Sequence, residues 1–362
     1  MRARLSEIAA AAGVSPATVS RVLNGKTGVA VSTRESVIRA LDGLGYERPE
    51  RLRTRSGRLV GLVVPELDNP VFPAFVHGIE SALTQYGYAT VLCTQTPGGA
   101  HEDDLTRTLI ETGVAGIIYV SGLHADATAD PSRYQELRRR GLPIVLVNGH
   151  VEGIDALCIS NDDVASMDLA VAHLAALGHE RIGLAVGPPR FVPVVRKIAG
   201  FRAAMRRRLG QEDVERWVAC TLFSMEGGAA AVRRLLPEGC TALICGSDVM
   251  ALGAIRAARE SGRRVPQDLS VVGYDDSALM AFTDPPLTTI RQVVPAMARA
   301  AARGLLDEIA AAEVGPRVEY LFRPELVVRG STDAAPPAAV LGENPAAVPD
   351  EKPVTAPNEN QD

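Results

Sequence analysis

Residues 5–25 read LSEIAAAAGVSPATVSRVLNG and decide how the rest of the chain is interpreted. Ile8 and the alanines predict a first helix that ends at Gly13, because glycine adopts the left-handed conformation of a helix end without steric cost. Ser15 is a good amino-terminal cap, and Pro16 fits the first position of a second helix. The tight turn between them predicts a helix-turn-helix whose second helix presents small and basic side chains to a DNA groove. A helical hairpin with a merely solvated basic face is the structural alternative.

The charge of the chain is divided unevenly. The whole sequence carries a net charge of −5, which alone argues against nucleic acid. Residues 1–58, however, hold eleven Lys and Arg against five Asp and Glu, a net +6, so the remaining residues carry −11. A basic amino-terminal part on an acidic body is typical of a phosphate-binding module joined to a domain with a different task.

The composition is that of a globular protein with two or three cores. The chain has 362 residues, of which 46% are hydrophobic and 22% are charged. It contains no apolar run of membrane-spanning length and no signal peptide before the first helix, so we expect a cytoplasmic protein without membrane contact. The five cysteines form no C-x-x-C pair and are expected to be reduced thiols.

From residue 59 onward, short apolar runs alternate with amphipathic segments. Buried strands are expected at residues 59–64, 115–120, 144–147, 182–186, 243–245 and 269–273. Amphipathic helices are expected at residues 75–86, 165–177, 200–209 and 250–261. This alternation predicts parallel sheets built from right-handed crossover units, with ligands in the crevice outside the carboxyl ends of the strands.

Changes in composition and in the spacing of apolar residues divide the sequence into four segments. A helix-turn-helix DNA-binding domain is expected over residues 1–46, followed by a short basic linker over residues 47–58. The α/β body covers residues 59–332 and is expected to hold both the ligand site and the dimer interface. Residues 333–362 are rich in Ala and Pro, acidic and without periodicity, so a disordered tail is expected there.

The segment AGVSPATVSRVLNG resembles the recognition segment of the LacI/GalR family of bacterial transcription regulators, and residues 33–35 and 44–46 match the ends of that family's third helix. Further words follow in the family's order: DNPVF from residue 68, LGHERI from 177, SDVMALG from 247, VPQDLSVVGYDD from 265, LTTIRQ from 287 and RGST from 329. The resemblance implies a small all-α head and a body of two parallel-sheet subdomains around a cleft, similar to periplasmic sugar-binding proteins.

The same resemblance implies which residues of the head touch DNA. Pro16 and Ala17 stand at base-reading positions but offer no hydrogen bonds, so apolar contact with thymine methyl groups is expected. Arg21 is expected to bind a guanine through two hydrogen bonds, with a phosphate contact as the alternative. The expected phosphate anchors are Ser15, Thr18, Ser20, Asn24, Thr33 and Arg34.

The linker departs from the family pattern, because it is about three residues shorter, roughly one helical turn. Leu52 stands at the position of the family's leucine that wedges into the minor groove. Arg53 is one of three nearby arginines suited to contact with the DNA backbone. The alternative is an exposed leucine in a flexible basic linker that holds DNA by charge alone.

Signatures of catalysis are missing from the sequence. It contains no nucleophile elbow, metalloprotease helix, P-loop or dinucleotide fingerprint. The six histidines are scattered, with His101 and His124 expected at the surface, so we expect no metal site, no cofactor and no enzymatic activity. Asp275 and Asp276 are adjacent at a strand end and are therefore expected to point in different directions.

Family positions carried over to this chain give eight expected effector-binding residues: Phe72, Asn148, Arg190, Arg196, Lys197, Phe223, Ser247 and Asp275. Phe72 would stack on a ring, Phe223 would cover the ligand, Asn148 would bond to a hydroxyl, and Asp275 would accept from ligand donors. Lys197 and Ser247 replace the family's usual Arg and Asn. The three basic members hint at an anionic effector. A core position or an ordinary ion pair is the alternative for each residue.

The resemblance implies a repressor that binds a near-palindromic operator in double-stranded DNA as a homodimer. A sugar or sugar derivative in the cleft would modulate the operator affinity. A regulator controlled by a protein corepressor, or by a nucleoside or purine, is the alternative. A solute-binding protein for uptake fits the body but not the head, and an α/β enzyme is not supported by any nucleophile or cofactor fingerprint.

Overall fold

The computed structural model describes residues 5–23, 58–95, 101–311 and 318–337, together with seven isolated residues between 29 and 44. Several predictions about the head, the linker and the tail concern residues outside these ranges. The residues in question are Asn24, Arg34, Leu52 and Arg53, with most of the linker and residues 338–362.

The helices of the head are α1 (Leu5–Ala12) and α2 (Pro16–Leu23). Gly13 follows α1 with a positive φ of 65°, and Ser15 accepts a hydrogen bond from the Thr18 amide at 3.1 Å. Ile8 and Val19 are fully buried in a small core shared by the two helices. These contacts confirm the predicted helix-turn-helix and its caps.

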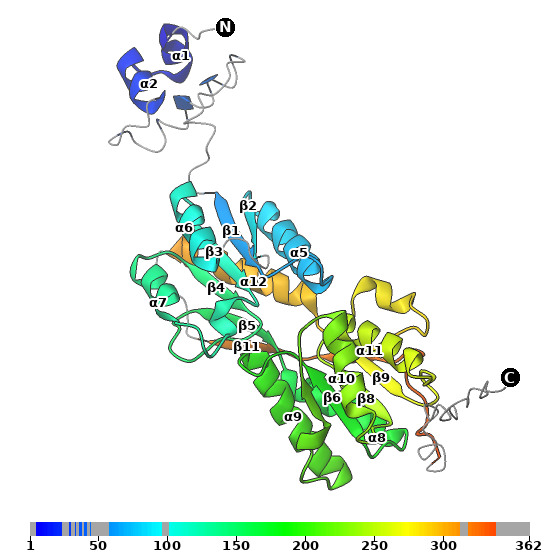
Figure 1. Ribbon diagram of the computed structural model, residues 1–362. Coiled ribbons are helices and arrows are strands. Elements are labelled where there is room, and N and C mark those ends of the chain that lie inside the picture. Colours follow the sequence, from blue (N-terminus) through cyan, green and yellow to red (C-terminus); the bar gives the residue numbers. More distant parts are fainter. Residues whose placement is uncertain are drawn as a thin grey trace, which may run out of the picture.

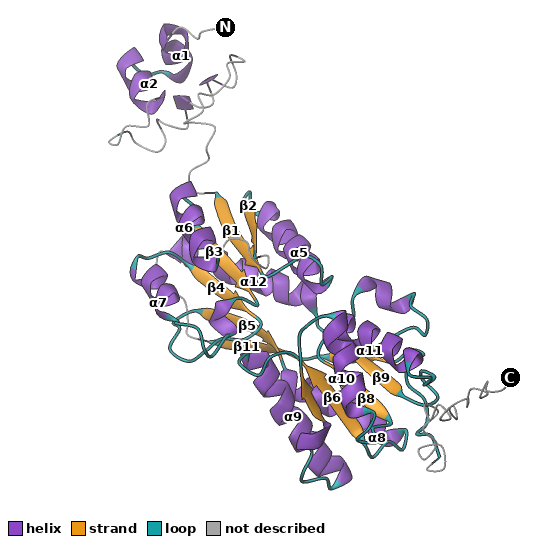
Figure 2. Ribbon diagram, in the orientation of Figure 1, coloured by secondary structure: helices purple, strands orange, loops and turns teal. Residues whose placement is uncertain are grey.

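The body contains two six-stranded sheets with helices packed against them, shown in Figures 1 and 2. The strands are β1 (Leu59–Val64), β2 (Ala89–Thr94), β3 (Gly116–Val120), β4 (Ile144–Val147), β5 (Leu157–Asn161), β6 (Ile182–Val186), β7 (Val218–Cys220), β8 (Ala242–Cys245), β9 (Ser270–Asp275), β10 (Thr288–Arg291), β11 (Glu319–Phe322) and β12 (Glu325–Val327).

The α-helices of the body are α5 (Val71–Gln85), α6 (Glu102–Thr112), α7 (Ser132–Arg139), α8 (Asp163–Ala176), α9 (Val192–Leu209), α10 (Met225–Leu235), α11 (Asp248–Glu260) and α12 (Val294–Ala311). Three short 3-10 helices are η1 (Leu123–Ala125), η2 (Glu215–Trp217) and η3 (Ala278–Ala281).

The strand order of the first sheet is β11-β5-β4-β3-β1-β2, and that of the second is β12-β10-β9-β8-β6-β7. All neighbouring strands are parallel except β12, which pairs with β10 in the antiparallel sense. The predicted class, an all-α head followed by two parallel-sheet subdomains, is therefore confirmed.

The chain passes between the two subdomains three times (Figure 1). It leaves the first sheet after β5, returns after β10 into α12, and crosses again between β11 and β12. α12 packs against α5, β3, β4 and β5, so it belongs to the first subdomain although it follows the second in sequence. Three adjacent crossovers are the segments at which one subdomain can rotate against the other.

The predicted tail begins with residues that are bonded to the second subdomain. The Asp333 carbonyl lies 3.0 Å from His179 Nε2, and the Ala335 amide donates to the Leu177 carbonyl at 2.9 Å. The ordered body therefore extends beyond the expected boundary at residue 332, because these main-chain groups find partners on it. Among the described residues, none of the helices combines the length and apolar character needed to cross a bilayer.

Helices α10 and α11 approach each other so closely that glycine is needed at the contact. A Cβ atom on Gly228 would lie 1.9 Å from the Met250 carbonyl oxygen, and a Cβ on Gly253 would lie 1.9 Å from that of Met225. The space that a Cβ atom would need is occupied by main-chain atoms, which cannot move aside as a flexible side chain can. The two glycines therefore set the distance between the helices.

We predict that Gly228→Ala lowers the free energy of unfolding by about 1–3 kcal/mol, because overpacking exceeds the gain in helix propensity of about 1 kcal/mol. Urea unfolding measures the change. Ala230→Ser, at an exposed position of the same helix, is the control and should alter stability by less than about 1 kcal/mol. A Gly228→Ala protein as stable as the unsubstituted one would contradict the proposed contact.

Candidate functional site

Five of the eleven residues expected to touch DNA belong to α2, and Ser15 caps that helix. Ser15, Pro16, Ala17 and Arg21 are exposed, whereas Thr18, Ser20 and Thr33 are half-buried. Ser15 Oγ and Thr18 Oγ1 lie 2.9 Å apart. The structure thus leaves the base-reading positions accessible, and their contact with DNA stays a prediction.

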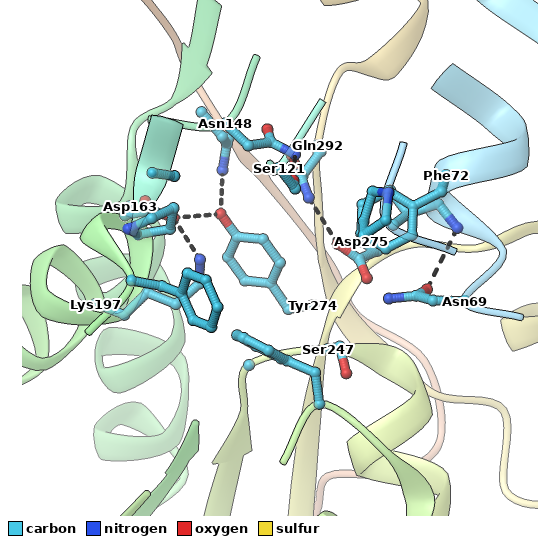
Figure 3. Close-up of a pocket in the computed structure, with 18 of the residues that line it drawn as sticks. Asn69, Phe72, Ser121, Asn148, Asp163, Lys197, Ser247, Tyr274, Asp275 and Gln292 are labelled. Carbon is cyan, nitrogen blue, oxygen red and sulfur yellow. Dashed lines mark hydrogen bonds and ion pairs between the residues drawn. The ribbon is translucent and has the colours of Figure 1, made fainter. Parts of the chain in front are cut away.

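A cavity of about 180 Å³ lies where the carboxyl ends of the two sheets face each other (Figure 3). Its polar lining comes from loops, strand ends and the first turns of helices in both subdomains. The first contributes Glu66, Asn69, Ser121, Asn148, Ser160 and Asn161, and the second contributes Asp163, Lys197, Ser247, Tyr274 and Asp275. Gln292, in the second crossover, joins them. The location is the one expected from the parallel topology.

Six of the eight residues expected to bind an effector line this cavity: Phe72, Asn148, Lys197, Phe223, Ser247 and Asp275. Ser247 also caps α11, because its Oγ accepts from the Met250 amide at 3.2 Å. Asn148 donates to Ser121 Oγ at 2.8 Å. The structure brings these side chains together, and their role in binding stays a prediction.

Arg190 and Arg196 do not line the cavity, which corrects their expected placement. Arg190 Nε donates to Asp126 Oδ2 at 2.8 Å, an ion pair that joins the two subdomains. Arg196 donates to both oxygens of Glu319, at 2.6 and 2.9 Å. Both guanidinium groups are therefore engaged with carboxylates, which is the ordinary ion pair weighed as the alternative.

Lys197 does line the cavity, but its charge is also balanced. Its Nζ donates to Asp163 Oδ1 at 2.6 Å and lies 4.0 Å from the centroid of the Tyr274 ring. Both members of this ion pair are buried. Since each of the three expected bases is neutralised by an acid, the hint of an anionic effector loses its physical basis.

Asp275 is a buried carboxylate at the end of β9. Its Oδ1 accepts from Gln292 Nε2 at 2.6 Å, whereas Oδ2 is buried without a hydrogen-bond partner among the described residues. Burial and the nearby Asp248 carboxylate raise its pKa well above the ordinary value. Asp276 instead bonds to Arg291 and Arg329, so the two neighbouring acids do point in different directions.

Four residues other than glycine have positive φ angles in the described part of the chain: Ser121 (49°), Asn148 (71°), Asp275 (114°) and Asp276 (57°). All four stand at or just after the carboxyl end of a strand, and three of them line the cavity. Such backbone conformations are strained for residues with a side chain and gather at functional sites. The strain is an independent indication that this edge binds a ligand.

Sequence reasoning missed a hydrogen-bond network that joins the two subdomains in the wall of the cavity. The Tyr274 hydroxyl accepts from Asn161 Nδ2 at 2.6 Å. It donates to Asp163 Oδ1 at 2.7 Å (Figure 3). Burial raises the pKa of Tyr274 well above its ordinary range. Asn161 ends β5 and Asp163 begins α8, so both flank the first crossover. The sequence signal that could have found them is a pair of polar residues directly after the apolar run of β5.

The loop that carries η1 is held by a buried polar cluster. Glu102 Oε2 accepts from the Leu123 amide at 3.0 Å, and its other oxygen accepts from the Tyr134 hydroxyl. His124, expected at the surface, is fully buried with Nε2 3.0 Å from the Val147 carbonyl, and burial lowers its pKa to about 4. The cluster therefore fixes the position of η1, whose last residue, Ala125, lines the cavity and precedes Asp126.

Three phenylalanines give the cavity its apolar walls. Phe72 comes from α5 of the first subdomain, whereas Phe191 and Phe223 belong to loops of the second. Aromatic faces combined with carboxylate, amide and hydroxyl groups suit a ligand with a ring and several hydroxyl groups. In the described residues, the lining contains neither histidine nor cysteine.

Comparison with known proteins is consistent across the head and the body. Residues 4–49 match the model of bacterial regulatory proteins of the lacI family, and residues 171–332 match that of the periplasmic binding protein-like domain. The chain is 61% identical to the HTH-type transcriptional regulator MalR of Streptomyces coelicolor, over 93% of this chain and 98% of that protein.

Solved structures extend the comparison to the whole fold. A complex of the transcriptional regulator CelR with cellobiose is 36% identical, with a TM-score of 0.68 over 91% of this chain and 100% of that one. A Lac repressor dimer bound to operator and the anti-inducer ONPF is 29% identical, with a TM-score of 0.71 over 92% of this chain and 100% of that one. The chain therefore belongs to the LacI family of bacterial regulatory proteins and is a DNA-binding transcriptional regulator.

Proposed function

We propose that the chain is a repressor that binds a near-palindromic operator as a homodimer and changes its operator affinity when an uncharged sugar binds the cavity. The observation that carries the proposal is the buried Oδ2 atom of Asp275, which faces a polar and aromatic cavity and accepts no hydrogen bond of normal geometry from the described residues. A buried oxygen of this kind gains most from a hydroxyl donor.

The charges around the cavity favour a neutral ligand over an anionic one. Lys197 is the basic residue of the lining and is bonded to Asp163, whereas Glu66 and Asp275 add further carboxyl groups. A phosphate would therefore meet more negative than positive charge, and its burial would be costly. The similarity to a regulator solved with cellobiose supports the same class of ligand.

A sugar in this place would contact both subdomains and so bias their relative rotation. Asn148 and Phe72 lie on one side, and Asp275 and Phe223 lie on the other. The Arg190–Asp126 ion pair across the mouth would favour the closed arrangement. A ligand shifts such an equilibrium by its difference in affinity for the two states, and about 1–3 kcal/mol is enough for regulation.

The dimer is supported by exposed apolar side chains on the second subdomain. Leu222 and Met225 lie at the start of α10, and Leu279 and Phe282 lie at η3, with Phe282 85% exposed. A two-fold interface would remove such side chains from water. The dimeric, operator-bound Lac repressor supports this assembly. A regulator of this kind is expected to act in the cytoplasm, where the chromosome lies.

Thermal melting against sugars, sugar phosphates, nucleosides and purines tests the proposal. We expect a neutral sugar to raise the melting temperature, since a ligand at 100 times its dissociation constant adds about 2.7 kcal/mol. Asp275→Asn should weaken binding of that sugar roughly 2- to 10-fold, because a hydrogen bond between neutral groups contributes about 0.5–1.5 kcal/mol.

Asp213→Asn, at an exposed position outside the lining, is the matched control and should leave sugar binding unchanged. Stabilisation by a nucleoside or a sugar phosphate instead of a sugar would contradict the ligand class. A panel without any response, from protein that still binds DNA, would favour a protein corepressor.

The buried acids predict a pH dependence of stability. Burial raises the pKa of Asp248 to about 6 and raises that of Asp275 well above its ordinary value, so the folded state binds more protons than the unfolded state above about pH 4. Stability contributed by these groups is therefore lost as the pH rises through the folded pKa values. Urea unfolding should show that Asp275→Asn gains stability relative to the unsubstituted protein as the pH rises above about 4, the ordinary pKa of an aspartate. Parallel curves for the two proteins would contradict this.

We predict that sequence-specific DNA binding depends on the side chain of Arg21. Duplex sites selected from a random pool supply the probe, and Arg21→Gln should weaken binding to the best site by about 1–3 kcal/mol while non-specific binding changes less. Arg140→Gln, at an exposed position on the body, removes the same charge as a control. Equal losses on selected and random duplexes would assign Arg21 to a phosphate contact.

A further inference from the structure

His150, Cys158 and Glu319 form a cluster of three side chains with metal-ligating atoms. They come from the loop after β4, from β5 and from β11. One ligand atom of each lies within 4.8 Å of the others, and Cys158 Sγ is 3.8 Å from Glu319 Oε1. None of the three lines the effector cavity, so the cluster is a separate feature of the first subdomain.

We infer that His150, Cys158 and Glu319 bind a divalent cation of the Zn²⁺ class. Zn²⁺ takes nitrogen, sulfur and oxygen ligands in tetrahedral geometry, and three protein ligands leave a fourth position for water. Its bond lengths place ligand atoms roughly 3.3–3.8 Å apart. The sulfur and the carboxylate oxygen already meet this distance. The histidine nitrogen lies within 4.8 Å of both and has to approach by no more than about 1.5 Å.

The cluster contains polar atoms that lack good partners within the described residues. His150 Nδ1 is buried without a hydrogen bond. The Cys158 thiol is completely buried, and its contacts with Ser160 Oγ, at 3.4 Å, and with Glu319 are long and weak. Buried groups of this kind normally have a partner, and a metal ion would supply one to both.

Arg196 is compatible with this role, although it is bonded to the same glutamate. A carboxylate has about four lone-pair positions, and the guanidinium uses two of them. Such outer partners orient a ligating carboxylate toward its metal. On binding, the thiol would lose its proton to solvent, so the cation, the thiolate, Glu319 and Arg196 would together carry one positive charge.

Sequence reasoning expected no metal site because the histidines are scattered along the chain. His150 meets Glu319 only because β11, 161 residues after Cys158, pairs with β5 in register, with Cys158 opposite Glu319. The cluster also borders the wall of the cavity, since Ser160 Oγ contacts Cys158 and accepts from the Gly149 amide at 2.9 Å.

Titration of the full-length protein, free of any affinity tag, with Co²⁺ alone tests the inference. Tetrahedral Co²⁺ bound by a thiolate gives visible absorption and a sulfur-to-cobalt charge-transfer band. We expect one Co²⁺ per chain with both features, and displacement by Zn²⁺. Cys158→Ser, His150→Gln and Glu319→Gln should each weaken Co²⁺ binding by at least about tenfold.

Cys220→Ser, at an exposed thiol, and His101→Gln, at an exposed histidine, are the matched controls and should keep the spectrum. Thermal melting without metal shows whether each variant is folded, and Glu319→Gln tests the site even if the buried Cys158→Ser protein unfolds. A missing charge-transfer band in the unsubstituted protein, or a band that survives in a folded Glu319→Gln or His150→Gln protein, would overturn the inference.

Discussion

The arrangement of the body depends on one buried hydroxyl. Tyr274, at the end of the second sheet, bonds to Asn161 of the first sheet and to Asp163 at the start of α8, and Lys197 lies over its ring. All four side chains are buried, so each unmade bond would cost about 1–3 kcal/mol. This network holds the carboxyl ends of the two sheets opposite each other. The cavity lies in the space between these two ends.

Local sequence patterns were sufficient for the elements with continuous apolar runs and for the helix-turn-helix, whose caps are local. Among the described strands they missed β2, β5, β7, β10, β11 and β12. The sequence of β11, EYLF, is largely exposed and shows no buried pattern. The sequence pattern placed the start of helix α9 near residue 200, but the helix begins at Val192. The first turn was missed because the sequence Val-Pro-Val-Val is typical of a strand. Pro193 is tolerated there because it lies in the first turn, where its missing N–H is not needed.

The candidate site also contains residues that the sequence placed correctly and residues that it misplaced. Asn148 and Asp275 stand at strand ends, and the carboxyl ends of parallel strands meet at one edge, so position alone brings them to the cavity. Arg190 and Arg196 were misplaced because their partners, Asp126 and Glu319, lie 64 and 123 residues away. Long-range ion pairs leave no local pattern, so only the folded chain reveals which charges are available to a ligand.

The three crossovers have a consequence for how the protein is made. The first sheet begins with β1, yet it is completed by β11, which leaves the ribosome only after the whole of the second sheet except β12. Domains usually fold in order of synthesis, with the amino-terminal one first. Here the subdomain that starts first keeps one edge of its sheet open and one face without α12 until translation is nearly finished, so it depends longest on protection from aggregation.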